Sequence, residues 1–133
     1  MPRDSNLHAL YQKDKAAQKM GIVIESLEPG QATLSMQVLE WMIQGHMICH
    51  GGFIFALADT AMAYASNKDA TTHVALNANI DFLKPTKLGD HLIARASEGD
   101  RTRKTGMYNV TVAIKNGPLI AEFRGRTYAL STR

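Results

Sequence analysis

Asp59 stands alone in an otherwise largely apolar stretch, which makes it the first residue to consider for chemistry. The stretch from residue 53 to 66 contains good helix formers and no proline, so it is expected to be a helix. A carboxylate inside an apolar helix costs several kcal/mol unless it is paired, hydrogen-bonded or open to a site. Asp59 therefore either caps a neighbouring loop or reaches solvent, or it is a general base or nucleophile poised by partial desolvation. Thr60 and Tyr64 lie near enough to orient it or an attacking water.

Two glycines, Gly51 and Gly52, precede this helix. Glycine at a helix start costs conformational entropy, so its use suggests that a ligand atom approaches the backbone. Free N–H groups and the helix dipole favour negative charge there, which is how an oxyanion hole is built. The alternative is a tight corner that requires positive φ.

The spacing of these two features predicts how they can act together. Gly51 and Asp59 are eight residues apart, about 12 Å along a helix, so one carbonyl cannot touch both within one chain. If both serve one reaction centre, the aspartate comes from a second subunit whose helix runs antiparallel alongside. The prediction is a two-fold dimer with two equivalent composite sites.

Other reactive residue types surround the glycines. His50 could polarise a substrate or simply brace the loop. His46 and His50 have the i,i+4 spacing of a zinc site on a helix, but the composition of this segment indicates a loop, so no metal site is predicted. Cys49 beside His50 resembles a thiol nucleophile, yet adjacent residues in an extended chain point in opposite directions, which argues against their pairing.

The elements that position these residues follow from periodicity and turn residues. The helix from residue 51 to 67 is apolar nearly all the way round, so its surroundings must bury it. A curved antiparallel sheet wrapped around that helix is the simplest way to do this, an α+β fold. The other predicted elements are a helix from about residue 6 to 18, a hairpin around Pro29-Gly30 whose second strand spans about 32 to 38, a loop over 40–49, and strands over 73–83, 91–98, 103–115 and 118–130.

Composition narrows the class of protein. The chain has 133 residues with 45% apolar and 20% charged residues, which suits one globular domain and not a disordered chain. The net charge of +3 indicates either an ordinary solvated surface or a ligand that carries phosphates. Scattered basic residues argue against nucleic acid, and no apolar stretch is long enough to span a membrane. One cysteine and no export signal predict a cytoplasmic protein.

Several short motifs occur in a fixed order along the chain. They are Gly45-His46, Cys49-His50-Gly51-Gly52, Phe55-Ala56-Leu57-Ala58-Asp59-Thr60-Ala61, Tyr64-Ala65, Asn67, Ile80-Asp81-Phe82-Leu83-Lys84-Pro85, Gly89-Asp90, Lys104-Thr105-Gly106 and Phe123-Arg124-Gly125. Together these motifs resemble a known family, the hotdog-fold acyl-coenzyme A thioesterases of phenylacetic acid degradation, and the resemblance spans residues 20 to 130.

The resemblance implies a hotdog thioesterase domain over residues 20–133, preceded by a helical segment over 1–19. It also implies a homodimer with a continuous sheet, usually paired further into a tetramer. The implied reaction is hydrolysis of arylacetyl-CoA thioesters, with ring-hydroxylated substrates such as 3,4-dihydroxyphenylacetyl-CoA. No separate cofactor is expected, because coenzyme A is part of the substrate.

The resemblance also implies residue roles. Asp59 matches the nucleophile or general base, and the Gly51 amide matches the donor that polarises the thioester, with His50 beside it. Gly52 and Thr60 are expected to bind substrate. Gln44 stands where the family usually has asparagine; its amide is one methylene further out, so its hydrogen bond to substrate is expected to shift or be lost. Candidates for the coenzyme A phosphates, if they are not ordinary exposed charges, are Lys84, Arg101, Arg103 and Lys104.

Two other functions stay open at this point. Hotdog proteins include acyl-thioester dehydratases, in which His50 and Asp59 would share the proton transfers, and formation of free thiol would separate the two reactions. A non-catalytic acyl-CoA binding module, with a structural Asp59, would bind ligand without turnover, and Gln44 is the feature that favours it.

Overall fold

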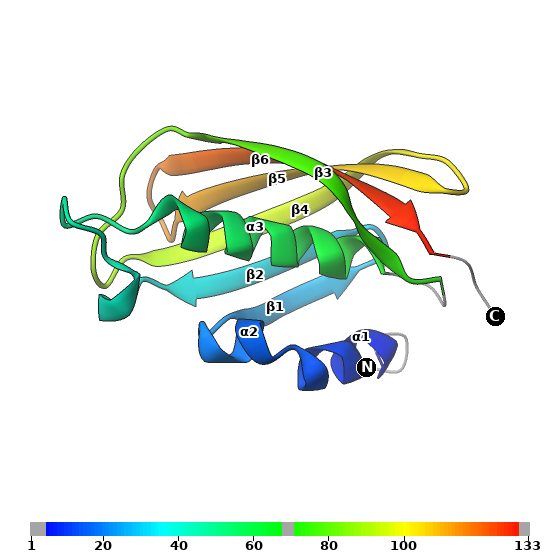
Figure 1. Ribbon diagram of the computed structural model, residues 1–133, viewed down its shortest axis with the longest axis horizontal. Coiled ribbons are helices and arrows are strands. Elements are labelled where there is room, and N and C mark those ends of the chain that lie inside the picture. The colour runs from blue at the N-terminus through cyan, green and yellow to red at the C-terminus, as the bar shows by residue number, and fades with distance from the viewer. Residues whose placement is uncertain (1–4, 68–70, 131–133) are drawn as a thin grey trace.

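A curved six-stranded antiparallel sheet wraps around one central helix, α3, in the computed structural model, which describes residues 5–67 and 71–130 (Figure 1). The strand order is β1-β2-β4-β5-β6-β3, so β1 and β3 are the two edges. The strands are β1 (Val23–Glu28), β2 (Gln31–Gln37), β3 (His73–Phe82), β4 (His91–Arg101), β5 (Thr105–Ile114) and β6 (Leu119–Ala129), and the helices are α1 (Ser5–Lys13), α2 (Lys15–Lys19), the 3-10 turn η2 (Glu40–Met42) and α3 (Gly51–Ser66).

The core lies between α3 and the concave face of the sheet. Leu57, Ala58, Ala61 and Ala65 of α3 are fully buried, and the small alanine side chains let the strands approach the helix closely. Burying a side chain such as Leu57 contributes about 2 kcal/mol. The α+β architecture of a hotdog fold, with a central helix wrapped by sheet, is therefore confirmed.

The N-terminal segment differs from the expected single helix over residues 6 to 18. It forms two helices that break at Asp14, whose Oδ1 accepts a hydrogen bond from the Ala17 N–H at 3.1 Å and so caps α2. Aspartate favours caps over helix interiors, because its side chain competes for backbone N–H groups. Its second oxygen accepts from the Tyr64 hydroxyl of α3 at 3.2 Å, which attaches this segment to the central helix.

All the predicted strands are present, but their ends at one hairpin differ from the prediction. β4 continues to Arg101 and β5 begins at Thr105, whereas the predicted strands end at Glu98 and begin at Arg103. The sheet register shifts between Glu98 and Arg101, so a bulge absorbs Gly99-Asp100 and the strand continues past a pair that resembles a turn. The predicted Asn116-Gly117 turn is confirmed, with φ of 58° at Asn116.

The two edges of the sheet carry different side chains. Exposed Glu25, Ser26 and Glu28 lie on β1, beside the N-terminal helices (Figure 1). On β3, by contrast, Leu76 is 57% exposed and Phe82 is 52% exposed. No helix of the described residues is both long enough and apolar enough to span a bilayer.

Candidate active site

The loop over residues 43–50 fixes where α3 begins. Ile43 bridges to Cys49, and the Gln44 N–H donates to Ile48 O at 2.8 Å, so the loop closes on itself. The Cys49 N–H donates to Thr86 O, and the His50 N–H donates to Met42 O, both at 2.8 Å. These bonds hold the first residue of α3, Gly51, at a defined place beside the end of β3.

Gly51 is glycine for a steric reason. Its φ is not positive, so the interpretation of a tight left-handed corner is wrong. A Cβ on Gly51 would lie 2.8 Å from Cζ of Phe82, whereas a Cβ on Gly52 would meet nothing within 4 Å. The N–H groups of a first helical turn have no acceptor within the helix, so the Gly51 amide is suited to polarise a ligand oxygen next to the Phe82 ring.

A cavity of about 510 Å³ opens beside Gly51. Gln44, which the sequence analysis expects to bind substrate, is part of its wall, and its Oε1 accepts a hydrogen bond from the His46 N–H. The apolar residues of the wall were not predicted from the sequence as site residues, although Phe82 and Leu83 belong to the motif from Ile80 to Pro85. The cavity is lined in part by Gln44, Ile48, Ile54, Phe82, Leu83 and Lys84.

Asp59 lies two turns further along α3, on the flank toward β6 and β3. At 100° per residue it is about 40° around the helix from Phe55 and about 140° from Tyr64. Phe55 packs on Phe123 of β6 with ring centroids 5.3 Å apart, whereas Tyr64 packs on Tyr11 of α1 with centroids 6.5 Å apart. Asp59 thus lies nearer the Phe55 side of α3, which faces β6, than the Tyr64 side, although Asp14 is close enough for its charge to act on Asp59.

The environment of Asp59 favours its neutral form. Asp59 is half-buried, and this burial, with a smaller contribution from the negative charge of Asp14, raises the pKa of its carboxyl above the ordinary value. A raised pKa makes the carboxylate a stronger base near neutral pH. This is the physical state expected of a general base in a partly desolvated site.

The neighbours predicted to orient Asp59 bond elsewhere. The Thr60 hydroxyl donates to Ala56 O at 2.6 Å, the usual back-bond of threonine in a helix. The Tyr64 hydroxyl donates to Asp14, and burial together with the charge of Asp14 raises the pKa of Tyr64, so it remains a donor. Tyr64 therefore does not orient Asp59, and the expectation that it could is wrong.

The other reactive side chains near Gly51 are His50 and Cys49. His50 precedes α3, is exposed, makes no side-chain cap bond and packs edge-on to Phe53. Cys49 is buried, and burial raises the pKa of its thiol although the Thr86 hydroxyl partly opposes the shift, so Cys49 is a poor nucleophile. Within residues 5–67 and 71–130, no three His, Cys, Asp or Glu side chains could hold a metal ion together.

The structure separates the four predicted phosphate-binding residues. Lys84 lies at the cavity beside Gly51. Arg101 turns inward at the other end of β3, where it bonds Tyr108 Oη at 3.0 Å and His73 Nε2 at 2.6 Å and lies 3.9 Å from Glu98. Arg103 and Lys104 are exposed in the adjoining turn. Since β3 spans about 30 Å between His73 and Phe82, these residues cannot meet one ligand within a single chain.

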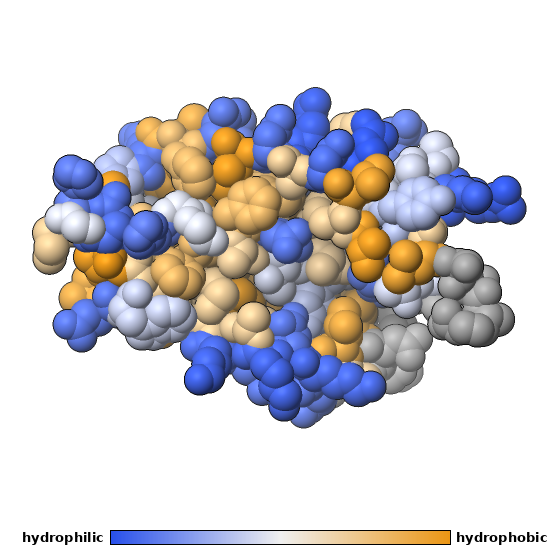
Figure 2. Space-filling view, viewed as in Figure 1, coloured by the Kyte–Doolittle hydropathy of each residue, from blue (hydrophilic) through white to orange (hydrophobic). Residues whose placement is uncertain are grey.

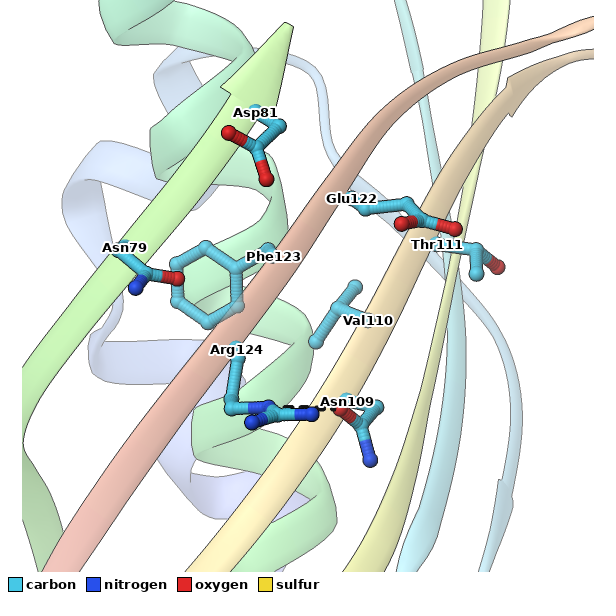
Figure 3. A pocket seen from close by; sticks show the side chains of 8 residues that line it. All are labelled: Asn79, Asp81, Asn109, Val110, Thr111, Glu122, Phe123 and Arg124. Carbon is cyan, nitrogen blue, oxygen red and sulfur yellow. Dashed lines mark hydrogen bonds between the residues drawn. The ribbon is translucent and has the colours of Figure 1, made fainter. Parts of the chain in front are cut away.

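A second depression lies on the opposite, convex face of the sheet. It has a volume of about 440 Å³ and is mostly polar, with Asn79, Asp81, Glu122 and Arg124 around it (Figure 3). Arg124 Nε donates to Asn109 Oδ1 at 3.4 Å across it. The sheet separates this groove from Gly51 and Asp59, so it is not part of the candidate active site.

A hotdog fold with an amide donor at the start of the central helix and a carboxylate in its middle defines a class, the thioesterases. The family profile described as "Thioesterase superfamily" matches residues 46–121 of this chain. In the solved structures, the chain is similar to PaaI of Escherichia coli, from the phenylacetic acid degradation operon, with a TM-score of 0.94 and 39% identity over 97% of this chain and 94% of that one.

Sequence similarity gives the same result. The acyl-coenzyme A thioesterase PaaI of Escherichia coli K12 is 40% identical over 94% of this chain and 89% of its own length. A mutant of PaaI from Thermus thermophilus is 36% identical, with a TM-score of 0.84 over 88% of this chain and 100% of that chain. A Streptococcus mutans protein bound to acetyl-CoA is 26% identical, with a TM-score of 0.80 over 84% of this chain and 90% of that chain.

The chain therefore belongs to the thioesterase superfamily, and within it to the acyl-CoA thioesterases of the PaaI type.

Proposed function

We propose that this protein hydrolyses (hydroxy)phenylacetyl-CoA to the free acid and coenzyme A, with Asp59 and Gly51 of opposite subunits acting on one thioester. The observation that carries the proposal is Asp59, a half-buried carboxyl with a raised pKa on an otherwise apolar helix. The relation to PaaI of the phenylacetic acid degradation operon supports the arylacetyl group. The relative that holds acetyl-CoA supports a coenzyme A thioester as the ligand.

The chemistry needs only these two groups and water. The Gly51 N–H donates a hydrogen bond to the carbonyl oxygen and stabilises the negative charge that develops on it. Asp59 either takes a proton from a water molecule that attacks the carbonyl carbon, or attacks that carbon itself to form a mixed anhydride that water then hydrolyses. In both routes the carbon–sulfur bond breaks, and coenzyme A leaves as the thiolate.

A second copy of the chain completes the site in this proposal. The β3 edge carries one acidic residue, Asp81, against Glu25 and Glu28 on the shorter β1, and it exposes Leu76 and Phe82, which favours pairing with another β3. A two-fold axis between two antiparallel β3 strands makes one continuous sheet and sets the two α3 helices antiparallel on its concave face. The face that carries α3 is largely apolar across its middle (Figure 2). An apolar face of this kind supports its burial against a second subunit, and it also supports the pairing of two such dimers.

The same two-fold axis assigns the phosphate-binding residues. It reverses β3, so Lys84 of one subunit lies at the level of the turn that carries Arg103 and Lys104 in the other. These three exposed cations are then available to one coenzyme A, whereas Arg101 is engaged by Tyr108 and His73. Loss of Lys84 or Lys104 is expected to raise KM for a coenzyme A thioester and to leave KM for the corresponding pantetheine thioester unchanged.

The decisive experiment compares wild type with Asp59→Asn, which keeps the size of the side chain and removes its basicity. Release of free thiol from 4-hydroxyphenylacetyl-CoA is measured, with circular dichroism as the control for folding. Wild type is expected to turn over, and Asp59→Asn to lose on the order of a hundredfold or more in kcat.

Each other result points to a different function. Equal activity of the two proteins contradicts the role of Asp59. An acyl-thioester dehydratase, with His50 and Asp59 as its acid and base, releases no thiol. A binding module binds the thioester in calorimetry but turns over neither this substrate nor other acyl-CoA esters.

A further inference from the structure

We propose that Phe82 and Ile48 are specificity-determining residues, which select an aromatic acyl group in the cavity beside Gly51. The inference rests on the proposed function, in which the thioester carbonyl binds at the Gly51 amide. It adds the position of the acyl group and the residues that choose it.

The position of the carbonyl decides which part of the substrate enters the cavity. A carbonyl oxygen bonded to the Gly51 N–H lies about 2.9 Å from that nitrogen, so the atoms on either side of the carbonyl lie at the cavity mouth. The side chains of Ile48, Ile54, Phe82 and Leu83 make the cavity wall largely apolar. Coenzyme A carries a polar pantetheine and charged phosphates, which are costly to bury, so the acyl group is the part that fits.

Phe82 is the side chain placed to contact a ring at that position. The tip of its ring would be 2.8 Å from a Cβ on Gly51, and the ring forms part of the cavity wall. An arylacetyl ring begins one methylene beyond the carbonyl, which puts it next to Phe82 once the carbonyl is at Gly51. Two rings at that spacing favour an edge-to-face arrangement, which a straight alkyl chain cannot make.

The cavity has room for such a ring, and Ile48 limits that room. About 150 Å³ is enough to hold benzene, so about 510 Å³ accepts a phenylacetyl group with ring substituents. Ile48 is half-buried in this wall, and its carbonyl is fixed by the Gln44 N–H at 2.8 Å. A larger side chain at this position is therefore expected to fill the cavity while the loop backbone stays in place.

The experiment measures kcat/KM of wild type, Phe82→Leu and Ile48→Trp for phenylacetyl-CoA, hexanoyl-CoA and acetyl-CoA. Leu88→Trp is the matched control, because Leu88 is exposed in the next loop and does not line the cavity. Phe82→Leu is expected to lower the preference for phenylacetyl-CoA over hexanoyl-CoA by roughly three- to tenfold. Ile48→Trp is expected to lower the rate with phenylacetyl-CoA at least about tenfold more than the rate with acetyl-CoA.

A second measurement separates failure of this inference from failure of the proposed function. Calorimetry with the non-hydrolysable phenethyl and hexyl thioethers of coenzyme A reports acyl-group preference without turnover. If both variants keep the wild-type preference between acyl groups, in kinetics and in binding, the inference is overturned even when the enzyme is active. A protein that hydrolyses none of the thioesters contradicts the proposed function, while loss of the phenethyl preference in Phe82→Leu still supports the acyl position.

Discussion

Gly51 contributes a backbone group to the candidate site, whereas Asp59 contributes a side chain. Both were predictable from the sequence, because a lone carboxylate and a pair of glycines are each out of place in an apolar helix. The close contact of Gly51 with the Phe82 ring was not predictable, since Phe82 is far away in the sequence. The four candidate phosphate-binding residues likewise could not be distinguished in the sequence. Only the structure shows that Arg101 turns inward and bonds Tyr108 and His73.

The Gly51 amide can be removed without removing the helix. Proline is well tolerated at the first position of a helix, and it has no N–H. Gly51→Pro and Gly51→Ala both place a Cβ against Phe82, so the two variants differ in the N–H, which the proline ring replaces with Cδ. We expect Gly51→Pro to have a kcat roughly a hundredfold lower than Gly51→Ala, measured by thiol release. Equal rates in the two variants would show that the amide does not polarise the thioester.

Asp59 is also expected to oppose folding when it is ionised. Its pKa in the folded state is raised, so the folded chain binds this proton more tightly than the unfolded chain, and stability is lost as pH rises through the raised pKa. Asp59→Asn cannot ionise. The melting temperature of Asp59→Asn relative to wild type should therefore rise between about pH 4 and pH 8. A constant difference across this range contradicts the raised pKa.

At the scale of elements, periodicity predicted the strands and the buried helix, because each buries one recognisable face. It did not predict the break between α1 and α2, where Asp14 caps α2 and also accepts a hydrogen bond from Tyr64, fifty residues away. It also ended β4 too early, because Gly99-Asp100 is typical of a turn and only pairing with β5 shows that the strand continues through a bulge.

The contact between Asp14 and Tyr64 should be measurable as stability. Tyr64→Phe removes one hydrogen bond and is expected to lower the free energy of unfolding by about 1 kcal/mol. Asp14→Ala removes the cap of α2 as well and leaves the hydroxyl of Tyr64, which is only 1% exposed, without this acceptor, so a loss of about 2 kcal/mol is expected. Urea unfolding at one pH compares the two, and a larger loss in Tyr64→Phe contradicts this account.

At the scale of the whole molecule, the two edges of the sheet give a matched pair of tests. Leu76 on β3 and Val23 on β1 are exposed to similar extents, 57% and 51%. Lysine on an edge strand disfavours pairing with another strand. We expect Leu76→Lys to sediment as a monomer and to lose activity, while Val23→Lys keeps the mass of the wild-type assembly. Dissociation by Val23→Lys alone would place the interface at the other edge.

Composite sites also predict that two inactive variants restore each other. A dimer of one Asp59→Asn chain and one Gly51→Pro chain has one site with both groups intact, if the groups come from opposite subunits. Since half of the randomly mixed dimers are of this kind, refolding an equal mixture should give about a quarter of the wild-type activity. Sites built within one chain give no recovery after mixing.

The place of β3 in the sheet also affects how the chain is made. Within the described sheet, β3 pairs only with β6, the strand nearest the C-terminus. Roughly 40 residues must be synthesised between the end of β3 and the start of β6, which takes about 2 to 8 s at typical rates of translation. During that interval β3, the strand that carries Leu76 and Phe82, lacks its partner β6, so the nascent chain is most exposed to aggregation and to chaperones just before β6 leaves the ribosome.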